Sequence, residues 1–247
     1  MSKRIALVTG GIGGIGSSIC KQLSADGFTV VANYIAPEEA KAQAWLAAER
    51  AAGKDVHIAL GDVSNFESCV AMVAKIKAEV GPVSVLINNA GITKDGMFKK
   101  MSLDNWSNVI NVNLNSVFNV TKQVVDDMLA AGWGRIVNMS SVNGQKGQFG
   151  QANYAAAKAG MHGFTKSLAQ ETASKGITVN TISPGYIGTE MVMAIKQEVR
   201  DQIIATIPVG RLGKPEEIAK LVSYLVSDDA SFITGSNVSI NGGLHMF

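Results

Sequence analysis

Short apolar, β-branched runs alternate along this chain with longer segments of helical periodicity. Runs without polar alternation are typical of strands buried on both faces of a parallel sheet. Such strands are predicted at residues 5–8, 29–32, 56–60, 83–87, 135–139, 178–182 and 237–240, and helices at about 15–25, 37–52, 66–80, 103–131, 152–174 and 215–227. The alternation predicts one α/β domain over residues 1–247 with a doubly wound parallel seven-stranded sheet, whose ligand lies at the carboxyl ends of the strands.

One segment breaks this alternation. After the sixth strand, Pro184, Gly185 and Tyr186 are followed by a Met-rich amphipathic stretch at residues 191–195. An insertion at the carboxyl end of a strand is placed to cover a ligand, so a substrate lid is predicted at about residues 185–208. The alternative is that these methionines pack in the core.

Composition narrows the functional classes. Hydrophobic residues make up 47% of the chain and charged residues 17%, which indicates a compact core, and the net charge is only +2. Lys and Arg form no dense block interleaved with aromatic residues, so no nucleic-acid partner is expected. The two cysteines and three histidines lack metal-ligand spacing, so no metal is expected. No apolar run reaches the length of a membrane span and the first residues lead straight into a strand, which predicts a cytoplasmic protein without membrane contact.

A glycine-rich turn follows the first predicted strand and opens the first helix. It carries Gly10, Gly13, Gly14, Ile15 and Gly16. Glycines at such a turn let the backbone approach a pyrophosphate, and the helix N-terminus supplies unpaired N–H groups. In its strand–turn–helix context this turn predicts a dinucleotide site in a Rossmann-type fold.

The end of the second strand bears on the choice between NAD and NADP. No acid stands at the strand tip to bind the ribose hydroxyls of NAD, and Lys41, a few residues on, favours the 2′-phosphate of NADP. Glu38 and Glu39 leave NAD open, although an acid at a helix start is also explained by the helix dipole.

Two further loops are candidates for cofactor binding. Asp62 and Val63 follow the third strand, where Asp62 is expected to accept a hydrogen bond from the adenine amino group. Asn89, Ala90 and Gly91 follow the fourth strand, where small residues let the chain pass close to a ribose. Alternatively, asparagines at this position only cap the turn.

The candidate chemistry lies in a tyrosine and a lysine one helical turn apart. Tyr154 and Lys158 share one face of a predicted helix, and Ser141 follows the fifth strand. The ammonium favours the phenolate over the phenol, which is expected to lower the pKa of Tyr154. Tyr154 can then protonate a carbonyl oxygen, and Ser141 can donate to the same oxygen. Such a pair is usually a solvated one on a helix surface, but the dinucleotide turn favours catalysis.

These residues together resemble the classical short-chain dehydrogenase/reductases. The resemblance spans essentially the whole chain, and within the family the chain most resembles the acetoacetyl-CoA reductases of polyhydroxybutyrate synthesis. The general family motifs match residues 9–16, 88–91, Asn113, Ser141, 154–158 and Pro184 with Gly185, and the narrower resemblance rests on residues 141–151 and 241–246.

The resemblance implies roles that the pattern alone does not. Tyr154 would be the general acid, Lys158 would lower its pKa and hold the nicotinamide ribose, and Ser141 rather than Ser140 would orient the carbonyl. Asn113 would anchor a water in a proton relay. The other residues implied to border the cofactor are Pro184, Gly185 and Ile187. Many NADP-dependent relatives carry a basic residue where this chain has Gly13, which leaves Lys41 as the candidate for the phosphate.

The implied reaction is the NADPH-dependent reduction of acetoacetyl-CoA to (R)-3-hydroxybutyryl-CoA by a homotetramer. One alternative is the same reduction on an acyl carrier protein, because lysines near the expected mouth suit an acidic carrier as well as the phosphates of coenzyme A. Another is a non-catalytic dinucleotide sensor, which has no need of the Tyr/Lys pair. The expected substrate mouth is formed by Asp95, Ser141, Gln148, Phe149, Gly150, Gln151, Tyr154, Gly185, Tyr186 and Lys196.

Overall fold

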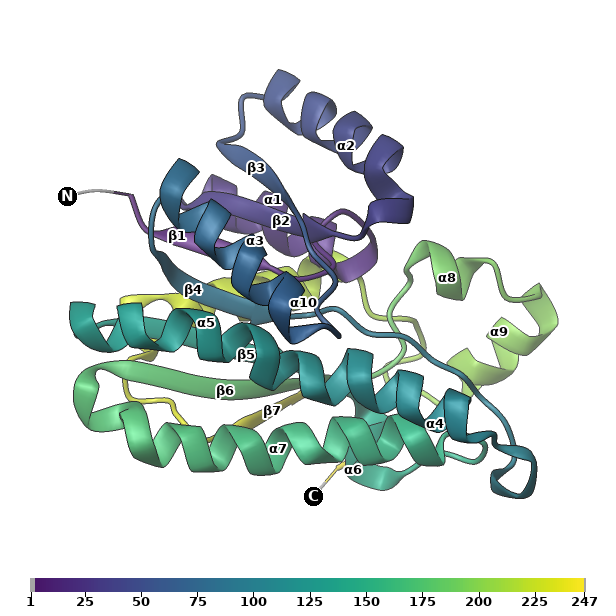
Figure 1. The fold of residues 1–247 in the computed structure, drawn as a ribbon. Coiled ribbons are helices and arrows are strands. Elements are labelled where there is room, and N and C mark those ends of the chain that lie inside the picture. Colours follow the sequence, from purple (N-terminus) through teal and green to yellow (C-terminus); the bar gives the residue numbers. More distant parts are fainter. Residues whose placement is uncertain (1–2, 247) are drawn as a thin grey trace.

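The computed structural model describes residues 3–246, with the backbone alone at Met191. Seven parallel strands form one sheet in the order β3-β2-β1-β4-β5-β6-β7, and helices cover both faces (Figure 1). The strands are β1 (Ile5–Val8), β2 (Thr29–Tyr34), β3 (Val56–Leu60), β4 (Val83–Asn88), β5 (Gly134–Met139), β6 (Ile177–Pro184) and β7 (Asn237–Ile240). The predicted single α/β domain and its seven strands are confirmed, and the strand order reverses between β1 and β4 as in Rossmann-type sheets.

The two faces of the sheet have separate helix layers. One face carries α1 (Gly14–Ala25), α2 (Glu39–Ala51) and α10 (Pro215–Val226), and α1 packs directly on α10. The other face carries α3 (Phe66–Glu79), α5 (Ser116–Ala131) and α7 (Ala152–Thr172). Each layer encloses its own cluster of buried apolar side chains.

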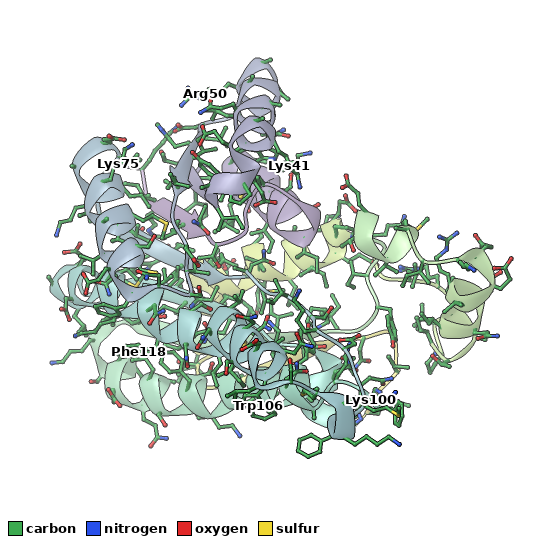
Figure 2. All side chains as sticks on the ribbon, turned by 45° about the vertical axis from the view of Figure 1, so that its right-hand side comes forward. Lys41, Arg50, Lys75, Lys100, Trp106 and Phe118 are labelled. Atoms are coloured by element: carbon green, nitrogen blue, oxygen red, sulfur yellow. The ribbon has the colours of Figure 1, made fainter. Side chains whose placement is uncertain are left out.

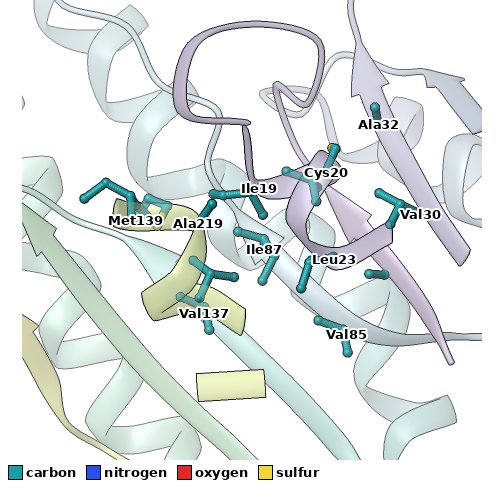
Figure 3. Packing of buried hydrophobic residues seen from close by; sticks show 14 of the residues in the cluster. Ile19, Cys20, Leu23, Val30, Ala32, Val85, Ile87, Val137, Met139 and Ala219 are labelled. Carbon is teal, nitrogen blue, oxygen red and sulfur yellow. The ribbon is translucent and has the colours of Figure 1, made fainter. Parts of the chain in front are cut away.

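Strand β1 illustrates why the strands read as unbroken apolar runs. Ala6 and Val8 belong to the cluster under α1 and α10, whereas Ile5 and Leu7 belong to the cluster under α3 and α5. Successive side chains of a strand point to opposite faces, so a strand with helices on both sides buries every residue. Figure 3 shows the first cluster, in which the helix layer meets the sheet through Ile19, Leu23, Ala219, Val85 and Ile87.

The helices depart from the prediction in four places. The predicted helix 103–131 is divided into α4 (Leu103–Ile110), a π-helical segment η3 (Asn111–Asn115) and α5. A short helix α6 (Val142–Lys146), which is too brief to show a periodicity, follows β5. The predicted helix 37–52 begins with a 3₁₀ turn, η1 (Ala36–Glu38), at Pro37 and continues as α2. The segment 185–208 contains α8 (Glu190–Met193) and α9 (Gln197–Ala205).

The amino edge of the sheet is closed by a cluster around Trp133. The guanidinium carbons of Arg4 and Arg135 lie 3.7 Å and 4.4 Å from the centre of its ring. The indole Nε1 donates to Asp228 (3.0 Å), whose carboxylate also pairs with Arg4 (3.1 Å). These contacts join β1, β5 and the end of α10 at the edge opposite the predicted site. The turns at Gly27 and Gly53 lie at this same edge, and a side chain at either glycine would point into open space.

Candidate functional site

The glycine-rich turn lies where β1 ends and α1 begins, and neighbouring residues approach it closely at two of its glycines. Gly10 has a φ of +60°, and a Cβ atom there would lie 3.2 Å from Cα of Ala90. A Cβ atom on Gly13 would lie 3.1 Å from Nζ of Lys41. The first turn of α1 offers N–H groups without partners inside the helix. This cradle fits a pyrophosphate, with the Lys41 ammonium directly beside it.

The approach of Lys41 to the turn places one cation beside the predicted nucleotide site. In Figure 2 Lys41 lies on α2. Its Nζ is 3.9 Å from a carboxylate oxygen of Glu38, whereas Glu39 is occupied by Tyr34 (2.7 Å) and Gln43 (2.9 Å). The two acids that could have bound the ribose hydroxyls of NAD thus have different positions. Glu38 faces Lys41, and Glu39 faces Tyr34 at the end of β2.

Two residues that the sequence analysis did not assign hold the turn in place. Oδ1 of Asn33, at the end of β2, accepts from the N–H of Gly10 (3.2 Å), and its Nδ2 donates to a carbonyl oxygen just after β3 (2.8 Å). Oγ1 of Thr9 accepts from the N–H groups of Asn89 and Ala90 (2.9 Å each). A polar residue that ends a buried apolar strand is the signal that identifies both.

The loop after β3 lies at the same edge of the sheet. Asp62 is exposed, and its Oδ1 accepts from the N–H (2.9 Å) and the hydroxyl (2.7 Å) of Ser64. Val63 is buried, and its carbonyl oxygen accepts from Asn119 (3.0 Å). Asp62 is thus presented to solvent at the carboxyl edge, where the prediction placed it.

Ser141, Tyr154 and Lys158 meet at the end of β5. Ser141 is the N-cap of α6, where its Oγ accepts from the N–H of Asn143 (3.1 Å), and its hydroxyl faces the phenol of Tyr154 closely enough to lower the pKa of that phenol. Lys158 is only 3% exposed, and its Nζ donates to the carbonyl oxygen of Met139 (2.7 Å). The hydroxyl of Ser140 instead donates to the backbone of Lys158 (2.9 Å). Of the two serines, therefore, only Ser141 faces the tyrosine.

The structure contradicts the expected direction of the pKa shift at Tyr154. Burial raises the pKa of this phenol, the hydrogen bond with Ser141 opposes the rise, and the charge of Asp95 adds to it. Nζ of Lys158 lies 5.6 Å from the ring centre, and burial lowers the pKa of Lys158 to about 7. The expectation from helical spacing included the charge of Lys158. It did not include the desolvation of Tyr154 and Lys158, which depends on burial by the rest of the chain.

Asn113 occupies the π-helical segment and is fully buried. Its Oδ1 accepts from the N–H of Ile92 (3.0 Å), and its Nδ2 donates to the carbonyl oxygens of Ile92 (2.8 Å) and Val109 (3.0 Å). A Cβ atom on Gly91 would lie 2.5 Å from Oδ1 of Asn113 and 3.4 Å from Nζ of Lys158. Asn113 therefore holds the loop after β4 close to Lys158, and the missing side chain of Gly91 permits this approach.

Two loops form the predicted mouth beside Tyr154, the loop after β4 and the one before α7. The N–H of Gly96 donates to the carbonyl oxygen of Gly150 (2.8 Å), and Nε2 of Gln151 donates to Asp95 (2.9 Å). Asn153, directly before the tyrosine, donates to the carbonyl oxygen of Lys94 (3.1 Å). The structure thus brings Asp95, Gly150 and Gln151 together.

The remaining mouth candidates lie farther out. Phe149 is 84% exposed, and Gln148, also exposed, accepts from Lys146 (2.9 Å). Lys196 is exposed in the turn between α8 and α9. Within residues 3–246 none of these three makes a hydrogen bond or an ion pair with Tyr154.

The segment 185–208 begins next to the glycine turn. A Cβ atom on Gly14 would lie 3.6 Å from Cγ2 of Thr189, which precedes α8. Gly185 follows Pro184 at the end of β6, and Ile187 is buried. A cavity of about 210 Å³ lies between the two ends of this segment, lined among others by Gly185, Tyr186, Ile187, Ile207 and Val209.

Over residues 3–246 no group of three or more His, Cys, Asp or Glu side chains is arranged to hold a metal ion. None of the helices in this part of the chain combines the length and apolar character needed to cross a membrane.

Comparison with known proteins gives matches over nearly the full length. A family model described as enoyl-(acyl carrier protein) reductase matches residues 10–245. An acetoacetyl-CoA reductase of Cupriavidus necator is 58% identical over 246 residues, which is 100% of each chain. Nodulation protein G of Azospirillum brasilense is 57% identical over 245 residues, 99% of each chain. A 3-oxoacyl-[acyl-carrier-protein] reductase of Escherichia coli is 46% identical over 243 residues, 98% of each chain.

Proposed function

This chain belongs to the short-chain dehydrogenase/reductase family, and we propose that it reduces acetoacetyl-CoA to (R)-3-hydroxybutyryl-CoA with NADPH. The observation that carries the proposal is the meeting of the Ser141 and Tyr154 hydroxyls beside the buried Lys158 at the carboxyl edge of the sheet. The choice of the CoA ester is supported by relatives named acetoacetyl-CoA reductase at up to 58% identity, against 46% for the carrier-protein reductase.

The nucleotide half of the site is assigned to the glycine turn and its neighbours. The first turn of α1 would hold the pyrophosphate, Asp62 the adenine, and residues 89–91 a ribose. Lys41 would hold the 2′-phosphate, since its ammonium lies beside Gly13. When bound, NADPH supplies the hydride that the 3-keto carbon accepts.

Residues of the protein itself supply the proton and orient the 3-keto group of the substrate. The hydroxyls of Ser141 and Tyr154 both donate to the 3-keto oxygen and stabilise the developing alkoxide. Tyr154 then transfers its phenolic proton to that oxygen. Because burial raises the pKa of Tyr154, the phenol is protonated at neutral pH and begins reduction as an acid. Lys158 is fixed by Met139 where it can stabilise the phenolate that remains.

Three further assignments belong to this proposal. Residues 185–208 act as a lid, because the segment starts beside the glycine turn and ends beside Tyr186. The enzyme is a homotetramer, which is supported by exposed apolar side chains on α4 and α5. Its location is the cytoplasm and its pathway that of polyhydroxybutyrate, as inferred from the cofactor and the CoA ester that the reaction uses.

The decisive assay follows NADPH oxidation by absorbance with acetoacetyl-CoA and with acetoacetyl carrier protein in parallel, and repeats the better substrate with NADH. We expect faster turnover of the CoA ester and of NADPH. The matched control is Tyr154→Phe, which should reduce kcat by roughly 10²-fold or more and leave NADPH affinity nearly unchanged.

Each other outcome points to a different function. Preference for the carrier protein would assign the enzyme to fatty-acid synthesis, where exposed Lys94, Lys99 and Lys100 would meet the acidic carrier. Preference for NADH would overturn the role of Lys41. Absence of turnover with either substrate, together with retained NADPH binding, would indicate a dinucleotide sensor.

A further inference from the structure

A hydrogen-bonded chain of three side chains runs along the mouth of the site. Nδ2 of Asn143, on α6, donates to Oε1 of Gln151 (2.9 Å), and Nε2 of Gln151 donates to Oδ2 of Asp95 (2.9 Å). The backbone N–H of Asn143 donates to Oγ of Ser141 (3.1 Å). One residue is thus bonded both to the serine of the site and, through Gln151, to a carboxylate in the loop after β4.

Asn143 is an unusual choice at this position if stability were its only role. Its side chain is buried, and among residues 3–246 its Oδ1 has no hydrogen-bond partner. A buried acceptor without a partner opposes folding, so an asparagine is poorly suited as a mere packing residue here. What it does provide is a fixed donor to Gln151.

Asp95 itself is exposed, and the bond from Gln151, the N-cap of α7, ties it to the first turn of the helix that carries Tyr154. An exposed carboxylate on a loop samples several directions unless it is held. Within residues 3–246 the bond from Gln151 is the one side-chain hydrogen bond of Asp95, and the Gln151 amide is oriented in turn by Asn143. The direction of the carboxylate therefore depends on α6.

We propose that Asn143 is a positioning residue that, through Gln151, holds the Asp95 carboxylate next to the Tyr154 phenol. The catalytic consequence of this inference rests on the proposed function. A fixed negative charge disfavours the phenolate, so Tyr154 retains its proton until the carbonyl oxygen of the substrate takes it. Burial, the hydrogen bond with Ser141 and Asp95 act on Tyr154 from the surrounding elements, and Lys158 lies on its own helix.

The mouth has other connections, so the variants are expected to fold. The backbone bond between Gly96 and Gly150 (2.8 Å) and the bond from Asn153 to Lys94 (3.1 Å) join the same two loops. Loss of the Asn143 side chain then frees Gln151 and Asp95 without releasing the loops themselves.

The primary test is an ultraviolet difference titration of the Tyr154 phenol, with each variant measured against its own Tyr154→Phe version, and it needs no turnover. Asn143→Ala and Asp95→Asn should each shift the phenol titration to lower pH. The double variant should shift it no farther than Asp95→Asn alone, because the charge that Asn143 holds is then already absent. Gln151→Met removes the middle one of the three hydrogen-bonded side chains, at a partly exposed position. It should reproduce the shift of the phenol titration to lower pH.

Gln145→Ala is the matched control, because Gln145 lies on α6 but bonds to Ser239 (3.0 Å) on β7, and it should leave the titration unchanged. Additive shifts in the double variant, or an unmoved titration in both Asn143→Ala and Gln151→Met, would overturn the proposal. In the turnover assay at alkaline pH, the same variants should lose kcat/KM several-fold relative to wild type. A wild type without turnover, in combination with the expected titration shifts, would reject the proposed function and leave the positioning role intact.

Discussion

Lys158 is buried, with its Nζ bonded to the carbonyl oxygen of Met139. Burial disfavours its charged form and lowers its pKa from 10.5 to about 7. The same burial raises the pKa of Tyr154. Burial therefore favours the uncharged amine of Lys158 and the uncharged phenol of Tyr154. A neutral phenol beside a half-charged amine suits an acid that must release one proton and recover it afterwards.

Removal of this amine should change how stability depends on pH. The unfolded chain keeps the Lys158 proton up to about pH 10.5, whereas the folded protein releases it near pH 7, so wild-type stability rises with pH between these values. Relative to Lys158→Met, the wild type should therefore gain roughly 2–3 kcal/mol in the free energy of unfolding from pH 6 to pH 9. Urea denaturation at the two pH values measures this difference.

Lys220→Met provides the control for that comparison. Lys220 lies on α10 and is exposed, so its replacement should give nearly the same change in stability at both pH values. A Lys158→Met difference that is equally independent of pH would show that the amine is not desolvated in the folded protein.

At the scale of elements, the π-helical segment η3 shapes the site. A residue inserted into a helix shifts the side chains that follow it and leaves backbone groups to be satisfied elsewhere. In this protein the side chain of Asn113 bonds to backbone groups beside the π-helical segment, with three hydrogen bonds to Ile92 and Val109. The same residue fixes the loop that carries Asp95.

Asn113→Ala should leave the backbone groups of Ile92 and Val109 unsatisfied in the interior. We expect a loss of about 2–4 kcal/mol in the free energy of unfolding, together with faster hydrogen exchange at the N–H of Ile92. Asn115→Ala is the control in the same segment, because Asn115 is exposed and its side chain, within residues 3–246, bonds to the side chain of Asn111 (2.8 Å) alone. Equal losses in the two variants would contradict the bracing role of Asn113.

The sequence predicted some of these elements and missed others for physical reasons. Strands β1, β2 and β5 are buried along their whole length and leave an unbroken apolar run, whereas β7 has only partly buried and exposed residues and was found from its short β-branched segment after the last helix. The π-helical segment keeps the helical pattern on both sides, so 103–131 looked continuous. Tyr154 and Lys158 were found because helical spacing is rigid, whereas the pKa of Tyr154 depends on burial by distant segments. The bonds of Asn143 and Asn33 join parts of the chain that no local pattern connects.

At the scale of the whole molecule, α4 and α5 expose large apolar side chains. Leu103 on α4 is 78% exposed and Phe118 on α5 is 52% exposed. The ring of Phe118 stacks on that of Phe66, on α3, with centroids 6.1 Å apart, and Figure 2 places Phe118 on the outer helix layer. This exposed pair of stacked aromatic rings is the feature that supports α5 as an interface of the proposed tetramer.

Phe118→Glu should therefore convert the tetramer to a smaller species, because a carboxylate in an apolar interface would be desolvated without a partner. Light scattering coupled to size-exclusion chromatography measures the mass directly. Tyr224→Glu, at a similarly exposed aromatic residue on α10, should leave the mass unchanged if α5 forms the essential interface. Dissociation by Tyr224→Glu alone would place that interface on α10 instead.

The parallel sheet also separates the molecule into an edge that carries chemistry and an edge that carries none of the proposed site residues. The turns at Gly27 and Gly53 belong to the second edge, and a Cβ atom at either glycine would have no neighbouring atom within 4 Å. A linker to a solid support, a fluorescent label or a fused scaffold attached there would point away from the proposed cofactor site and the mouth. The topology that gathers the proposed catalytic groups thereby also provides attachment points for an immobilised biocatalyst.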